Sequence, residues 1–90
     1  MTSITHRTEQ ARFELIVDGR ACVLDYQLRD GVMAILHTGV PAEVGGRSIA
    51  GQLTEFALQT ARERGWKVRP LCSYAAAFFK RHPEYNDLLR

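Results

Sequence analysis

The chain has 90 residues and a formal net charge of +2, and 46% of its residues are hydrophobic and 24% charged. This length allows one domain, and the composition is that of an ordinary globular protein. A charge of +2 does not by itself favour a nucleic-acid or membrane partner, although it suits a small polyanionic ligand. The N-terminus lacks the apolar segment of a signal peptide, and no apolar run approaches the roughly 20 residues of a membrane span, so we expect a cytoplasmic protein.

The first half of the chain alternates with a period of two residues. Residues 1–11 are polar, and we expect them to be a flexible N-terminus before a single domain over residues 12–90. Two alternating stretches follow, separated by Asp18-Gly19, and a nearly all-apolar stretch follows Asp30-Gly31. The pattern predicts a three-stranded antiparallel meander whose third strand, over residues 32–40, is covered on both faces.

The second half of the chain changes to a helical period. Apolar residues recur at helical spacing from Ser48, and Gly65 is the expected C-terminal stop. A short strand ending at Pro70, a helix over residues 73–81 and one or two helical turns after Pro83 complete the chain. The order β-β-β-α-β-α predicts an α+β fold with a crossover between parallel third and fourth strands.

Two glycines and an arginine, Gly45, Gly46 and Arg47, lie just before the long helix. A helix N-terminus presents unpaired N–H groups and the positive end of the dipole, glycines allow close approach of the backbone, and an arginine adds a cation. The stretch is therefore a candidate anion site. An ordinary turn with Ser48 as the N-cap uses the same residues, and spacing alone leaves both interpretations open.

Three side chains are candidates for chemistry or for a structural role. Cys72 directly precedes the second helix, where a thiol can be reactive, or it can be a small, partly buried hydrophobe. Cys22 lies within the apolar face of a strand and is expected to be structural. Both are expected to be free thiols, and we expect no metal site. His37, late in the third strand, is either a base or a hydrogen-bonded structural histidine.

Several segments together resemble the Gcn5-related N-acetyltransferase (GNAT) superfamily, and in particular its small, single-domain YjdJ-type members. The resemblance covers about residues 12–89 and rests on "HTGVPAEVGGRSIAGQLTEFAL" followed by "KVRPLCSYAAAFFKRHPEYNDLL". It implies a minimal GNAT-like fold, acetyl-CoA as co-substrate, and transfer of its acetyl group to an unknown amine acceptor. It also implies that the chain lacks the two helices that larger members insert after their first strand, so the acceptor side is open or is completed by another chain.

The resemblance also implies positions for the cofactor. The pyrophosphate loop of the family, Gln/Arg-x-x-Gly-x-Gly/Ala, aligns with residues 45–50, where Ala50 keeps the last small residue and Ser48 replaces the middle glycine. Backbone amides do most of the phosphate binding in this fold, and the end of the third strand lines the pantetheine arm. The implied cofactor-binding residues are Thr38, Gly39, Val40, Val44, Gly45, Gly46, Arg47, Ser48, Ile49, Ala50 and Cys72.

The implied catalytic residues are Cys72 and His37. Larger families carry a tyrosine general acid on the last helix, and Phe79 stands in its place here. Two routes stay open: direct attack of the amine with His37 or a water as base, or prior transfer of the acetyl group to Cys72. The alternative function is a non-catalytic acyl-CoA-binding or sensing module, and a small basic adaptor is a third possibility. No nucleic-acid or membrane partner is expected, and the protein is expected to be a monomer or homodimer.

Overall fold

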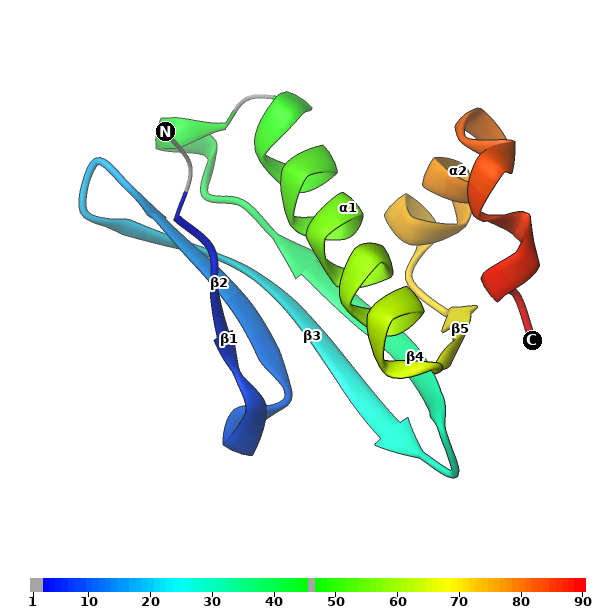
Figure 1. The fold of residues 1–90 in the computed structure, drawn as a ribbon. Helices are drawn as coiled ribbons and strands as arrows, with labels where there is room; N and C mark the ends of the chain where they lie inside the picture. The colour runs from blue at the N-terminus through cyan, green and yellow to red at the C-terminus, as the bar shows by residue number, and fades with distance from the viewer. Residues whose placement is uncertain (1–2, 46) are drawn as a thin grey trace.

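The computed structural model describes residues 3–45 and 47–90, and these form a five-stranded mixed sheet packed against two α-helices (Figure 1). The strand order is β1-β2-β3-β4-β5, antiparallel from β1 to β4 and parallel between β4 and β5. This confirms the predicted α+β fold class and the parallel crossover. The elements are β1 (Thr5–Arg7), the 3-10 helix η1 (Thr8–Gln10), β2 (Arg12–Val17), β3 (Arg20–Arg29), β4 (Val32–Gly39), the 3-10 helix η2 (Ala42–Val44), α1 (Arg47–Arg64), β5 (Lys67–Pro70), α2 (Ser73–Arg81) and the 3-10 helix η3 (Pro83–Leu88).

The two predicted hairpin turns form where the sequence places them. Asp18 and Gly19 both have positive φ, of 50° and 77°, and Asp30 and Gly31 have φ of 53° and 74°. Two consecutive residues with positive φ make the turn whose twist matches the flanking strands, and aspartate and glycine are the residues that tolerate it. These two turns fix the register of β2, β3 and β4.

The helices agree with the helical period, with one correction at the start of α1. The helix begins at Arg47, so Ser48 lies in its first turn and is not the residue before it. It ends at Arg64, and Gly65 follows with φ of 72°, as predicted for a left-handed C-terminal stop. The predicted second helix is confirmed over Ser73–Arg81, and the tail after it forms η3.

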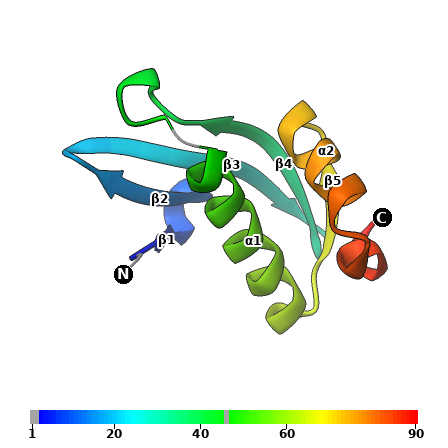
Figure 2. The same cartoon turned by 90° about the horizontal axis from the view of Figure 1, so that it is seen from above.

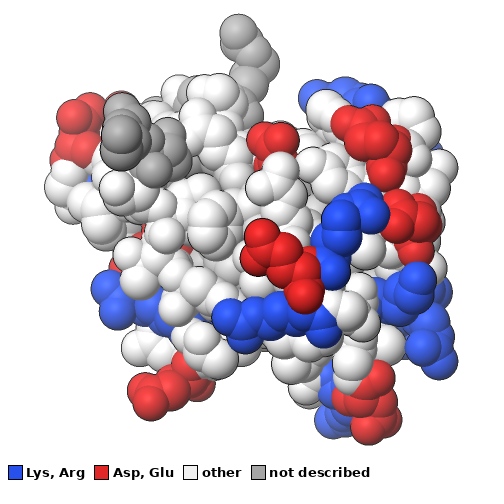
Figure 3. Space-filling view, in the orientation of Figure 1, with Lys and Arg blue, Asp and Glu red and all other residues white. Residues whose placement is uncertain are grey.

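Both helices pack on one face of the sheet, and the other face is open (Figure 2). On the helix-covered side, basic and acidic side chains are interspersed at the surface (Figure 3). The expectation that β4 is covered on both faces is therefore wrong. Val32 and Ala34 are only half-buried on the open face, and Leu36 is 47% exposed. The core residues are Phe13, Leu15, Cys22, Leu24, Tyr26, Met33, Ile35, Leu53, Ala57, Leu58, Ala61, Val68, Ala75, Phe78, Phe79, Tyr85 and Leu88.

The stretch over residues 1–11, which we expected to be flexible, contains regular structure from Thr5 on, and residues 1 and 2 lie outside the described residues. Thr5–Arg7 form β1, which pairs with β2 along the edge of the sheet. The ring of His6 stacks on Phe13 with centroids 4.1 Å apart, and its Nε2 lies 2.7 Å from the Tyr26 hydroxyl. This aromatic contact anchors a segment whose polar composition gives no strand signal.

The position of His6 predicts a pH-dependent stability. Burial, with a smaller contribution from the Arg64 guanidinium, lowers the pKa of His6 below its ordinary value of 6.5. The unfolded chain therefore binds a proton at higher pH than the native chain. This contribution to stability is present above pH 6.5 and is lost as the pH falls through the native pKa. We expect the thermal midpoint to fall more between pH 8 and 5 in the wild type than in His6→Gln. An equal fall of the thermal midpoint in the wild type and in His6→Gln would contradict the prediction. Arg81→Gln, a change at an exposed position on α2, is the control and should behave like the wild type.

Candidate functional site

The site begins where β4 and β5 diverge. Their parallel ladder ends at Ile35, whose carbonyl accepts N–H groups from both Leu71 and Cys72, at 3.1 and 3.0 Å. Beyond that point β5 turns into α2, while β4 continues to Gly39 with β3 as its partner. We call this divergence, between residues 36–39 and residues 71–72, the β4–β5 fork. In the described part of the chain, no strand pairs with β4 on its β5 side here, so this edge offers backbone groups to an extended ligand.

A β-bulge lies at the base of the fork. The pairing between β3 and β4 steps from Tyr26–Ile35 to Asp25–His37 and leaves Leu36 without a cross-strand partner. An inserted residue reverses which face the following side chains occupy. Thr38 is consequently opposite the fully buried Leu24 and points to the helix-covered face, whereas His37 shares the open face with Asp25.

The bulge brings Thr38, and not His37, to Cys72. The Thr38 Oγ1 lies 3.6 Å from the Cys72 Sγ, which links the end of β4 to the start of α2. Cys72 is the N-cap residue of α2, its thiol is free, and it is partly exposed at the fork. Cys22 is also a free thiol, as predicted, but it is fully buried in the core, and burial raises its pKa. The two cysteines therefore have different surroundings, as the sequence indicated.

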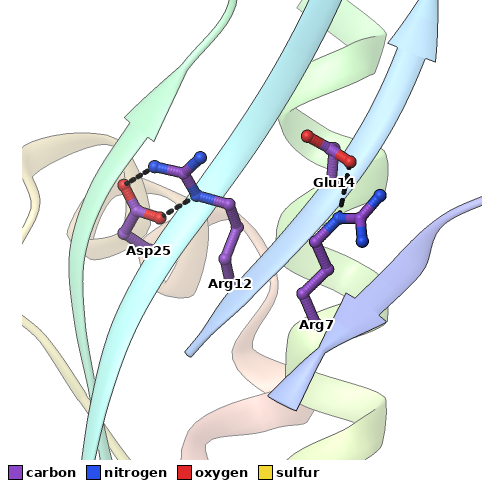
Figure 4. Close-up of polar contacts among 4 residues, drawn as sticks. All are labelled: Arg7, Arg12, Glu14 and Asp25. Atoms are coloured by element: carbon purple, nitrogen blue, oxygen red, sulfur yellow. Dashed lines mark hydrogen bonds and ion pairs between the residues drawn. The ribbon is translucent and has the colours of Figure 1, made fainter. Parts of the chain in front are cut away.

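His37 is exposed on the open face beside Gly39. A Cβ on Gly39 would lie 2.9 Å from the His37 Nε2, so glycine lets the imidazole lie over the end of β4. The neighbouring Asp25 carboxylate accepts a hydrogen bond from the Arg12 Nε at 2.6 Å (Figure 4). Within the described chain, the imidazole thus lies on the opposite face of the sheet from the Cys72 thiol.

In the loop from β4 to α1, two of the backbone amides that the family resemblance assigns to phosphate already donate hydrogen bonds within the loop. The N–H groups of Val44 and Gly45 donate to Pro41 and Ala42 within η2, at 3.1 Å each. Gly45 has φ of −60° rather than a positive value, and a Cβ there would lie 3.2 Å from the Ala42 carbonyl oxygen. The glycine is thus explained by close packing of the turn.

The N–H groups available for an anion are those of the first turn of α1, over residues 47–50. Ser48 is exposed there, and Ile49 and Ala50 are half-buried. Val40 and Val44 pack against the edge of the core and anchor the loop. Gly46 and the side chain of Arg47 lie outside the described structure, so their predicted roles stay predictions.

Tyr74, in the first turn of α2, is a residue of this region that the sequence analysis did not select. It is only half-buried, and its hydroxyl lies 3.4 Å from the position that a Cβ on Gly51 would take. Gly51 lies inside α1, where glycine costs up to about 1 kcal/mol relative to alanine. The sequence signal for this contact is the combination of Gly51, in the second turn of α1, with Tyr74, two residues after Cys72.

Residues 3–45 and 47–90 contain neither a cluster of metal ligands nor a helix that could span a membrane. No group of three or more histidine, cysteine, aspartate or glutamate side chains lies close enough there to hold a metal ion. Neither helix of this part of the chain has the length and apolar character needed to cross a bilayer.

Comparison with known proteins identifies similar sequences and structures. A protein-family model described as GCN5-related N-acetyltransferase matches residues 12–88. The fold is similar to the NMR solution structure of a GCN5-like candidate N-acetyltransferase from Staphylococcus aureus, with a TM-score of 0.76 and 25% sequence identity. This alignment covers 98% of the present chain and 87% of the other. The matched region includes the fork, the loop to α1 and both helices.

The different burial of the two cysteines predicts selective labelling. Iodoacetamide should modify the native protein once, at Cys72, because Cys22 is fully buried and its raised pKa disfavours the reactive thiolate. Intact mass measurement should show one adduct in buffer and two after denaturation, and Cys72→Ala should show none in buffer. Two adducts on the native wild type, or one on native Cys72→Ala, would contradict the assignment.

Proposed function

This chain belongs to the GCN5-related N-acetyltransferase family, and we propose that it transfers an acetyl group from acetyl-CoA to an amine at the β4–β5 fork. The observation that supports this most directly is the edge of β4 beyond Ile35, which pairs with no described strand on its β5 side; the helix α1 is the next α-helix along the chain. An edge that offers backbone hydrogen bonds and a helix end that favours anions suit an extended ligand with a phosphate group.

The residues present fit such a ligand in three places. The backbone of residues 36–39 would hold the pantetheine arm, and the first-turn amides of α1 would hold the pyrophosphate, with Arg47 as the side chain expected to assist. Thr38 and Cys72 would flank the thioester, because they join the two arms of the fork. When bound there, the thioester would supply the activated acetyl group.

His37 is the proposed base for direct attack by the amine. It lies on the open face at the fork, so an amine that approaches from this face can give up its proton to the imidazole. The free amine then attacks the thioester carbonyl, so that a carbon–nitrogen bond forms and the carbon–sulfur bond breaks. The nitrogen releases its second proton to solvent, and the departing CoA thiolate takes up a proton from a general acid. The open face supports this route because neither helix covers it.

Cys72 is proposed to line the thioester rather than to carry the acetyl group. A cysteine nucleophile is usually activated by a neighbouring base, and His37 lies across the sheet from this thiol. The hydrogen-bonding neighbour of Cys72 is the Thr38 hydroxyl, which is not a base at neutral pH. This arrangement favours direct attack over the covalent route.

Tyr74 is the proposed proton donor to the departing thiolate. Phe79, which stands where larger families have a tyrosine, is 4% exposed in the core and has no proton to give. Tyr74 is also on α2, and its hydroxyl faces the N-terminal half of α1 at Gly51. A phenol in this position is compatible with general acid catalysis on the helix-covered side of the fork.

Ligand-induced stabilisation tests the cofactor. A ligand that binds only the native state at 100 times its Kd adds about 2.7 kcal/mol, which for a domain of this size is a shift on the order of 10 °C. We expect CoA and acetyl-CoA to raise the thermal midpoint and ATP to raise it less. Arg47→Ala should reduce the shift, and Arg81→Ala, an exposed change in the last turn of α2, should not. No shift with either CoA compound would contradict the proposal and leave a basic adaptor as the better function.

Turnover separates the proposed roles. His37→Gln should lower kcat roughly 100-fold or more, because it removes a general base, whereas Cys72→Ala should keep most of the activity. Tyr74→Phe should lower kcat with little change in CoA affinity. Loss of turnover in Cys72→Ala, with an acetyl adduct on wild-type Cys72 in the intact mass, would instead support the covalent route. Tight CoA binding without turnover across a panel of amines would favour the acyl-CoA-binding module.

A further inference from the structure

The open face of the sheet carries a groove that runs along β4. Gln27, Ala34 and Arg69 lie side by side on β3, β4 and β5, and Arg29 and Val32 are paired in the next row. Residues paired in this way point to the same face of a sheet, so the short side chains of β4 form a floor between the longer ones of β3 and β5. The groove has a volume of about 340 Å³.

The charge in this groove is mostly positive. Three arginines line it, Arg29, Arg69 and Arg90, together with one acidic side chain, Asp30. Arg90 is held there because its N–H donates to the Val68 carbonyl at 3.1 Å, beside β5. A groove with three guanidinium groups and one carboxylate favours a negatively charged ligand.

None of these three arginines has a carboxylate partner in the described chain. On the same open face, the carboxylates of β2 and β3 are already held by arginines (Figure 4). The arginine–carboxylate ion pairs are Arg7–Glu14, Arg12–Asp25, Arg20–Glu43 and Arg62–Asp87. The groove arginines are therefore available to a ligand.

The shape and lining of the groove favour a peptide over a nucleic acid. No aromatic side chain lines the described groove, so bases would lack a surface on which to stack. The floor follows a β-strand, and carboxylates two residues apart on an extended peptide are spaced by roughly 7 Å. Guanidinium groups bind carboxylates in a bidentate way, and arginines on both sides of β4 could each take one.

The groove leads to the fork. Leu71, which is 60% exposed, lines the groove and is the residue whose N–H joins Ile35 where β5 leaves β4. His37 follows Ala34 by three residues, which is on the order of 10 Å along a strand, and it lies on the same open face. An extended peptide in the groove could therefore place its N-terminal amine near His37.

We propose that this groove recognises the acceptor, and that Arg29 and Arg69 select amines whose peptide carries acidic residues about three positions from the amine. The inference rests on the proposed acetyl transfer at the fork and names its substrate class. Arg90 adds positive charge at the β5 side, and Leu71 provides an apolar wall next to the reacting amine. The arginines act by binding the acceptor, so their replacement should change KM rather than kcat.

The test uses three six-residue peptides with a free N-terminal amine and an amidated C-terminus, identical except for glutamate, glutamine or lysine at positions four to six. The wild type should give the highest kcat/KM with the glutamate peptide. Arg29→Gln and Arg69→Gln should each raise its KM roughly fivefold, and the double change roughly 20-fold, with kcat retained. Arg69→Glu should move the preference toward the lysine peptide. Arg81→Gln, an exposed arginine on the helix-covered side, is the matched control.

Binding measurements keep this proposal separate from the acetyltransferase activity. Each peptide is titrated into the protein without acetyl-CoA, and binding is monitored by the NMR chemical shifts of the Arg29 and Arg69 backbone amides. Only the glutamate peptide should bind. CoA affinity, measured in parallel, should be unchanged in the groove variants. Equal binding of the three peptides, or a preference for glutamate that survives the double change, would overturn the proposal. Failure to bind CoA would overturn the proposed acetyl transfer. The peptide titration would still show whether the groove binds acidic peptides.

Discussion

The carbonyl of Ile35 organises the functional half of this fold. It accepts N–H groups from Leu71 and Cys72, so it is the last point at which β4 and β5 are joined. Ending the ladder there directs the chain into α2 and leaves the following residues of β4 with one unpaired edge. Because β4 still pairs with β3, its end stays ordered while this edge is available to a ligand. The cofactor and the acceptor are therefore expected to meet at a place defined by backbone geometry.

The bulge at Leu36 gives the two faces of the sheet different chemistry. A regular strand would put His37 on the same face as Met33 and Ile35, in the core beside the start of α2. The extra residue exchanges the faces, so that Thr38 contacts Cys72 and the imidazole is exposed on the other side. In the proposed reaction, a thioester near the thiol and a base near the incoming amine would thereby be separated by the sheet and would meet at the fork. This separation is the physical reason to prefer direct attack over a cysteine intermediate.

The local signals in the sequence were sufficient for most of the fold. Two Asp-Gly turns, Gly65 with its positive φ and the period of the second helix act within a few residues, so they could be read without tertiary information. The edge strand β1 could not be predicted from local signals, because its stability depends on the contact of His6 with Phe13 and Tyr26 across the sheet. The face of His37 also escaped prediction. One unpaired residue in β4 reverses it, and the residues around Leu36 carry no distinctive pattern.

The open face of the sheet is the side on which this chain has no covering helix in the described structure. The family resemblance implies that larger members insert two helices after their first strand, whereas here the first strand, β1, is followed by the short 3-10 helix η1 and then by β2. Val32, Ala34 and Leu71 are apolar and line the same groove as arginines that, in the described chain, have no carboxylate partner. Like charges that lie near one another and lack an oppositely charged partner destabilise a fold slightly unless a ligand neutralises them. Their grouping beside the fork is better explained by binding of an acidic acceptor than by solubility, since single charges on other strands would serve solubility equally well.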